Sequence, residues 1–147
     1  NDTIFEPGAS CTRAQMVTFL WRANGSPEPM VTELPFTDVA VDAYYAKEVL
    51  WAVENGITTG TNDTTFDPDG VVTRAEAVTF LWRAAGNPAA DGKLFADVDS
   101  TKYYAEAVRW AVANGVTKGV SNTSFAPGSA CTRAQIVTFL YRDCMNE

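Results

Sequence analysis

Three arginines occupy the same place in three nearly identical segments. The segments read TRAQMVTFLWR from Thr12, TRAEAVTFLWR from Thr73 and TRAQIVTFLYR from Thr132. A threonine followed three residues later by Glu or Gln is the pattern of a helix N-cap, so the arginines should stand at the first position of each helix. A cation is unfavourable there, but a guanidinium beside free backbone N–H groups can bind a carboxylate. The pattern indicates that a negative group lies beside Arg13, Arg74 and Arg133, either on a ligand or within the protein, and makes the three arginines candidate ligand-binding residues.

Each arginine also has a possible partner within the chain. The segments FTDV and FADV contain Asp38 and Asp97, and either carboxylate could pair with an arginine at a helix start. The two interpretations are compatible, because a paired arginine still has N–H groups to offer a ligand. Asp38 and Asp97 are therefore candidate site residues together with the arginines.

Two tryptophans are candidates for contact with a sugar ring. Trp51 and Trp110 lie off the main apolar face of their predicted helices, in line with Tyr44 and Tyr103. An aromatic face beside a cationic pocket would suit the C–H face of a sugar. The alternative is that both tryptophans pack against a neighbouring repeat.

Two glycines are candidates for close approach to a ligand. Gly60 and Gly119 close a loop before a short extended segment. Glycine permits a positive φ there, or brings the backbone close to a ligand. The alternative is that they simply form a turn.

Residues for catalysis and metal binding are scarce. The chain has no histidine, and no pair of carboxylates recurs. The segment NDTTFDPDG contains Asp63, Asp67 and Asp69 but lacks the alternating acids and the closing glutamate of a calcium loop. We expect no enzyme activity, no cofactor and no metal site.

The elements that position these residues come from an internal repeat. FTDVAVDAYYAKEVLWAVENGITTG from Phe36 and FADVDSTKYYAEAVRWAVANGVTKG from Phe95 align without a gap, and each is followed by one of the TRAE or TRAQ segments. Apolar residues at helical spacing predict two helices in each repeat. On the second helix, Trp21, Trp82 and Tyr141 should belong to the core. The first repeat has only its second half.

These boundaries divide the chain into three repeats that should pack as one domain. The divisions are the half-repeat 1–25, a linker 26–35, a full repeat 36–86, a linker 87–94, a full repeat 95–142 and a tail 143–147.

Composition narrows the possible partners. The net charge of −7 argues against a nucleic-acid surface, and no apolar run is long enough for membrane insertion. Residues 1–10 have no basic segment followed by an apolar stretch, so we expect no signal peptide here. Among the cysteines, Cys144 is too far along its helix to reach Cys131, and it is equally far from Cys11 if the central helices run parallel. Cys11 and Cys131 are then the only plausible internal pair, with Cys144 free or used between chains.

The order FTDV, YY, W, NGI-T-x-G, F-x-P and TRAE resembles the S-layer homology (SLH) domain family. The resemblance covers nearly the whole chain except the linkers and the last few residues. It implies a mainly α fold, a pseudo-threefold prism. A central bundle of the three TRAE or TRAQ helices would carry the other helices and the loops outside it.

The resemblance also implies a function. The family's members are usually non-catalytic modules that anchor exported bacterial proteins at the cell surface by binding secondary cell-wall polysaccharide. The ligand is often a sugar with an acidic pyruvate ketal, bound in grooves between repeats through the TRAE arginine. The missing half-repeat favours an alternative, a structural protein that uses this scaffold for self-assembly or protein binding. Another segment or another chain would then supply the missing half.

Overall fold

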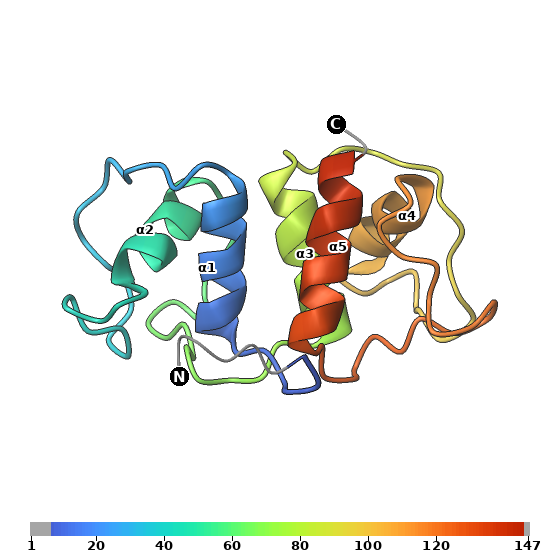
Figure 1. Cartoon of the computed structure of the whole chain (residues 1–147), viewed down its shortest axis with the longest axis horizontal. Helices are drawn as coiled ribbons and strands as arrows, with labels where there is room; N and C mark the ends of the chain where they lie inside the picture. Colours follow the sequence, from blue (N-terminus) through green and yellow to red (C-terminus); the bar gives the residue numbers. More distant parts are fainter. Residues whose placement is uncertain (1–6, 146–147) are drawn as a thin grey trace.

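The computed structural model describes residues 7–145, which form five helices. They are α1 (Arg13–Ala23), α2 (Ala46–Glu54), α3 (Arg74–Ala84), α4 (Ala105–Ala113) and α5 (Arg133–Met145) (Figure 1). Over this range the only extended pairing consists of isolated β-bridges, so the fold is mainly α as expected. None of the described helices has both the length and the apolar character needed to cross a bilayer.

The threonine N-caps form as the sequence predicts. Thr12 Oγ1 accepts a hydrogen bond from Gln15 N at 3.1 Å, and Gln15 Oε1 accepts one from Thr12 N at 3.0 Å. This is a complete capping box at the start of α1. At the start of α3, Thr73 Oγ1 accepts from Glu76 N, but the Glu76 carboxylate does not return to the Thr73 backbone. Glu76 Oε1 instead accepts a hydrogen bond from the Thr73 hydroxyl at 3.1 Å, and Glu76 Oε2 makes a contact described below.

A closed ring of backbone hydrogen bonds joins the three repeats just before these helices. The Cys11 N–H donates to the Cys131 carbonyl at 3.0 Å, the Cys131 N–H to the Val72 carbonyl at 2.9 Å, and the Val72 N–H to the Cys11 carbonyl at 2.8 Å. All three residues are fully buried. The ring fixes the three helix starts at one end of the molecule, around a common axis.

The same cyclic pattern satisfies the first N–H groups of each helix. Arg13 N donates to Gly70 O at 2.8 Å, and Ala14 N donates to Pro68 O at 3.0 Å. The corresponding amides of α3 donate to Ser129 and Pro127, and those of α5 donate to Ala9 and Pro7. The free backbone N–H groups that the sequence interpretation assigned to a ligand are therefore occupied by the next repeat. An acid at these helix starts must therefore be bound by side chains.

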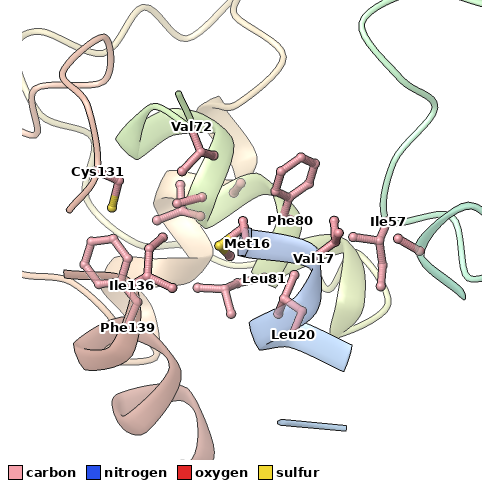
Figure 2. Close-up of a cluster of buried hydrophobic side chains, with 14 of the residues drawn as sticks. Met16, Val17, Leu20, Ile57, Val72, Phe80, Leu81, Cys131, Ile136 and Phe139 are labelled. Carbon is pink, nitrogen blue, oxygen red and sulfur yellow. The ribbon is translucent and has the colours of Figure 1, made fainter. Parts of the chain in front are cut away.

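The three second helices, α1, α3 and α5, run side by side from this end and form the predicted central bundle (Figure 1). Met16, Leu20, Leu81, Ile136 and Phe139 meet between them (Figure 2). Helix α2 packs on α1, and α4 packs on α3. Thus the first helix of each full repeat covers the second helix of the preceding repeat.

Tyr141 is the exception to the predicted core. Trp21 and Trp82 are half-buried, and their indole N–H groups donate to Pro27 O and Pro88 O in the linkers that follow. Tyr141 is 66% exposed, so its assignment to the core was wrong. The corresponding linker position, 147, lies outside the described residues, and no described helix covers α5 on this side.

The predicted cysteine pair lies in the hydrogen-bonded ring, but both thiols are free. Burial and the nearby Cys131 raise the pKa of Cys11 to about 12, with Arg133 acting in the opposite direction. Burial raises the pKa of Cys131 to about 11, against the effect of Arg74. Both thiols therefore stay protonated at neutral pH, and only the exposed Cys144 is open to solvent.

Candidate ligand-binding groove

Arg13 crosses from the first repeat to the second. Its Nε donates to the carbonyl of Phe66 at 2.8 Å, and its Nη1 forms an ion pair with the Glu76 carboxylate. The guanidinium also lies over the rings of Phe66 and Phe80, with its Cζ 5.0 and 5.4 Å from their centroids. Arg13 is only 7% exposed. Among the described residues its Nη2 has no hydrogen-bond partner, so this nitrogen can donate to a ligand.

Arg74 repeats this arrangement between the second and third repeats, with one difference. Its Nε donates to the carbonyl of Phe125 at 2.8 Å, and its guanidinium lies over Phe125 and Phe139. The residue equivalent to Glu76 is Gln135, and within residues 7–145 Arg74 has no ion pair. Burial lowers the pKa of Arg74, while Cys131 and Asp97 oppose that shift.

Arg133 has a less complete environment. Its Nε is buried and has no hydrogen-bond partner among the described residues. In the other two repeats this atom donates to a phenylalanine carbonyl, and the equivalent residue here, Phe5, lies outside the described range.

The two aspartates act on the backbone rather than on the arginines. Asp38 accepts hydrogen bonds from Phe66 N at 2.9 Å and Asp67 N at 2.7 Å. Asp97 does the same with Phe125 N and Ala126 N, at 2.9 and 2.8 Å. Neither forms an ion pair with an arginine in the part of the chain that the structure describes. Each aspartate instead fixes the turn whose phenylalanine carbonyl binds the arginine.

Asp97 makes the protein's stability dependent on pH. Burial of the carboxylate raises its pKa, but hydrogen bonds from Phe125, Ala126 and Ser124 outweigh this, and the pKa of Asp97 is lowered from 3.8. A lowered pKa in the folded state stabilises the protein above the unfolded pKa, and this contribution is lost as the pH falls. We expect Asp97→Asn to lower the urea midpoint by roughly 0.5 M at pH 7 and by much less at pH 3.

The control for this experiment is Asp91→Asn, which removes an exposed carboxylate from the linker 87–94. It should leave both midpoints unchanged. A difference between Asp97→Asn and the parent that is as large at pH 3 as at pH 7 would contradict the role of the ionised carboxylate.

A cavity of about 330 Å³ opens beside Arg13. It lies where three repeats meet: Arg13 comes from the first, a loop and one face of α3 from the second, and Tyr103 from the third. Its lining residues are Arg13, Thr58, Thr59, Gly60, Thr61, Glu76, Thr79, Phe80, Arg83 and Tyr103. The cavity thus combines two arginines, four threonine hydroxyls, one carboxylate and two aromatic rings.

Gly60 lines this cavity, and its geometry requires glycine. Its φ is +88°, and a Cβ at this position would lie 2.5 Å from both Phe36 Cε1 and Thr65 O. Gly119 has the same φ region and the same conflict, with Phe95 Cε1 and Ser124 O at 2.5 and 2.7 Å. The structural requirement is a tight turn around a buried phenylalanine. The close approach of a ligand to Gly60 remains a prediction.

The structure buries both tryptophans that were candidates for sugar contact. Trp51 and Trp110 are in the hydrophobic core, and neither lines the cavity. Their packing is the alternative that the sequence left open, and it removes their faces from solvent. We therefore leave Trp51 and Trp110 out of the site proposed below.

Sequence reasoning missed Tyr103 and Arg83. Tyr103 is 61% exposed and lines the cavity, with its ring edge-on to Tyr104. The sequence signal was the pair of adjacent tyrosines, because two neighbouring side chains cannot both face the core; in the structure Tyr103 is exposed and Tyr104 is half-buried. Arg83, in the last turn of α3, donates to Ile57 O at 3.2 Å and adds the second cation.

The S-layer homology domain model matches residues 35–78 and 94–137. The chain belongs to the S-layer homology domain family. The two matched segments carry both FTDV-type segments, the whole of α2 and α4, and the first turn of α3 and of α5 with Arg74 and Arg133. Arg13 belongs to the first SLH half-repeat, which precedes the matched segments.

Three curated relatives are similar to this SLH chain. A cell surface protein of Thermoanaerobacter kivui is 34% identical over 114 residues, 74% of this chain and 15% of that protein. The surface-layer 125 kDa protein of Lysinibacillus sphaericus is 32% identical over 76% of this chain and 10% of its own length. An endoglucanase of Bacillus sp. (strain KSM-635) is 31% identical over 74% of this chain and 11% of the enzyme. The SLH chain therefore spans only a small part of each relative.

Proposed function

We propose that the chain is a non-catalytic anchoring module that binds an acidic, pyruvylated cell-wall polysaccharide in the groove beside Arg13. The observation that carries the proposal is the cavity between repeats, which combines the Arg13 and Arg83 guanidinium groups with the exposed ring of Tyr103. The family and the surface-protein relatives indicate a location at the bacterial cell surface and support a role in cell-wall anchoring.

The chemistry of the groove fits an acidic sugar. Arg13 has an N–H group to offer a carboxylate, and its low exposure strengthens a charge-assisted hydrogen bond. Thr58, Thr59 and Thr61 can exchange hydrogen bonds with sugar hydroxyls. Tyr103 can pack its ring against the C–H face of the same residue. Glu76 pairs with Arg13 and holds its guanidinium in place.

Hydrolysis of the polysaccharide is not part of this proposal. Glycoside hydrolysis generally needs two carboxyl groups on opposite sides of the scissile bond. The cavity lining contains one carboxylate, Glu76, and that group is paired with Arg13. The similarity to the endoglucanase covers 11% of that enzyme and carries no activity over to this chain.

Calorimetric titration with purified cell-wall polysaccharide tests the proposal. The chain should bind polysaccharide that retains its pyruvate ketals and should lose most of that affinity after mild acid has removed them. Equal affinity for both preparations would reject recognition of the acid. Absence of binding to either would reject the anchoring function.

Tyr103→Ala tests the aromatic wall of the groove. Because the ring is exposed, its removal should leave the unfolding midpoint nearly unchanged and weaken polysaccharide binding by about 5- to 20-fold, the effect of losing about 1–2 kcal/mol of ring contact. Tyr44→Ala is the matched control, because Tyr44 has the equivalent position in the second repeat, is 72% exposed and does not line the cavity. Equal losses in both variants would contradict a specific role for Tyr103.

A further inference from the structure

Arg13 and Arg74 are fixed in the same way, although only Arg13 has an acidic partner among the described residues. Each Nε donates to a phenylalanine carbonyl at 2.8 Å. Each guanidinium lies over two phenylalanine rings, at 5.0 and 5.4 Å from the centroids for Arg13 and at 4.9 and 5.4 Å for Arg74. A carbonyl and two rings therefore suffice to place a guanidinium here. The main effect of Glu76 beside Arg13 is on the charge of the groove.

Glu76 lies in the wall of the cavity and is held there by two contacts. Its Oε2 pairs with Arg13 Nη1, and its Oε1 accepts a hydrogen bond from the Thr73 hydroxyl at 3.1 Å. The side chains of Arg13 and Glu76 are 8% and 23% exposed, so solvent screens this carboxylate only in part. The charged residues of the lining are Arg13, Arg83 and Glu76. The groove therefore has one positive charge in excess.

The hydroxyl of Tyr103 shows how this cavity affects a negative charge. Partial burial raises the pKa of Tyr103 above its usual 10, and Glu76 raises that pKa further. Arg83 and Arg13 act on the pKa in the opposite direction, each more weakly than Glu76. A negative charge that forms beside Tyr103 is thus disfavoured by the Glu76 carboxylate.

We propose that Glu76 determines the charge of the acid that the groove accepts, so that it binds a carboxylate in preference to a phosphate monoester. The inference rests on the proposed function, because it concerns the ligand of the same groove. A carboxylate has one negative charge and balances the excess positive charge. A phosphate monoester has up to two, and its second charge is repelled by Glu76. Glu76 acts in this way through its charge, without touching the ligand.

The equivalent positions around Arg74 lack this opposing charge. Gln135 takes the place of Glu76, and Lys118 adds a cation in the loop that corresponds to residues 58–61. The same arginine is therefore present in this chain with and without a facing carboxylate, which separates the effect of Glu76 on charge from any effect on position.

The variant Glu76→Gln tests the inference, and the other repeats indicate that it folds. Gln15 and Gln135 occupy the equivalent positions, and each accepts a hydrogen bond from the N–H of its cap threonine, at 3.0 and 2.9 Å. The two probes are glucuronate, which has one negative charge, and glucose 6-phosphate, which has two at about pH 8. Both are hexoses, and the amide resonances of residues 58–61 report their binding in an NMR titration.

The affinity for glucose 6-phosphate relative to that for glucuronate should rise about tenfold in Glu76→Gln, because removing a nearby negative charge favours a dianion more than a monoanion. A displaced Arg13 would weaken both probes together and leave this ratio unchanged. The control is Glu33→Gln, which removes an exposed carboxylate outside the cavity and changes the net charge equally. Its ratio should equal that of the parent.

An unchanged ratio in Glu76→Gln would overturn the inference. An equal rise in Glu33→Gln would overturn it as well, and so would a titration in which neither probe shifts the resonances of residues 58–61. These results are separate from the polysaccharide titration that tests anchoring. A parent chain that does not bind polysaccharide but shows the tenfold change would reject anchoring and keep the role of Glu76.

Discussion

Replacing Arg13 with alanine is expected to reduce the affinity for acidic wall polysaccharide by roughly 30- to 150-fold, which corresponds to about 2–3 kcal/mol. The substitution removes the buried cation that faces the cavity and leaves the Glu76 carboxylate as an unpaired negative charge in the same space. Both changes disfavour a carboxylate ligand. The measurement is calorimetric titration at a temperature where circular dichroism shows that the variant is folded.

Two further variants separate charge and geometry from stability. Arg22→Ala makes the same change in net charge on the exposed last turn of α1, outside the cavity, and should bind like the parent. Arg13→Lys keeps the charge but loses the fork that joins Phe66 O, Glu76 and the ligand, so its affinity should lie between those of the parent and the alanine variant. Parent-like affinity in a folded Arg13→Ala variant would remove Arg13 from the site.

Replacing Gly60 with alanine is expected to lower the free energy of unfolding by about 3 kcal/mol or more. The new methyl group would have to share space with the carbonyls of Thr65 and Asn62, at 2.5 and 2.7 Å, while the backbone holds a φ of +88°. Backbone atoms cannot rotate away as a side chain can, so the turn must open. Since the turn carries Phe66, whose carbonyl binds Arg13, the loss should also disturb the groove.

The matched control is Gly56→Ala, at the end of α2. Gly56 has a φ of +70°, but a Cβ there meets no atom within 4 Å, so only the backbone conformation is penalised, by about 1 kcal/mol. Urea unfolding of both variants gives the comparison. If Gly56→Ala costs as much as Gly60→Ala, the crowding around Gly60 is not the cause.

Much of the fold could be predicted from the sequence because its signals are local. A threonine with Glu or Gln three residues later marks the start of each central helix, and the structure has helices starting at Arg13, Arg74 and Arg133. Apolar residues at helical spacing also identified the outer helices. The central bundle then follows from the repeat, because equivalent helices have equivalent apolar faces and can bury them against one another.

The contacts of the candidate site could not be predicted in this way because they join distant parts of the chain. Arg13 pairs with Glu76, 63 residues away, and the same glutamate was interpreted as a helix cap. Two of the three equivalent positions contain glutamine, and Gln15 does complete a cap. The helix-cap pattern fits Glu76 and Gln15 equally well. Only the packing of one repeat on the next shows that Glu76 pairs with Arg13.

Burial of the large aromatic residues depends on coverage as well as on helical face. Trp82 and Tyr141 occupy the same face of equivalent helices, and the sequence assigned both to the core. A linker covers the tryptophan and accepts its N–H at Pro88, whereas the tyrosine is exposed. Periodicity identifies the side of a helix that can be buried, but the neighbouring segments decide whether it is.

The ring of backbone hydrogen bonds at Cys11, Val72 and Cys131 makes the alignment of each repeat depend on the other two. If one of these three segments shifted by a single residue, two of the three hydrogen bonds would break. The carbonyls that accept the first N–H groups of the neighbouring helix would also be displaced. Insertions should therefore be poorly tolerated between this hydrogen-bonded ring and the helices. They should be better tolerated in the exposed residues 31–33 of the first linker, where the polypeptide can lengthen without changing how the repeats meet.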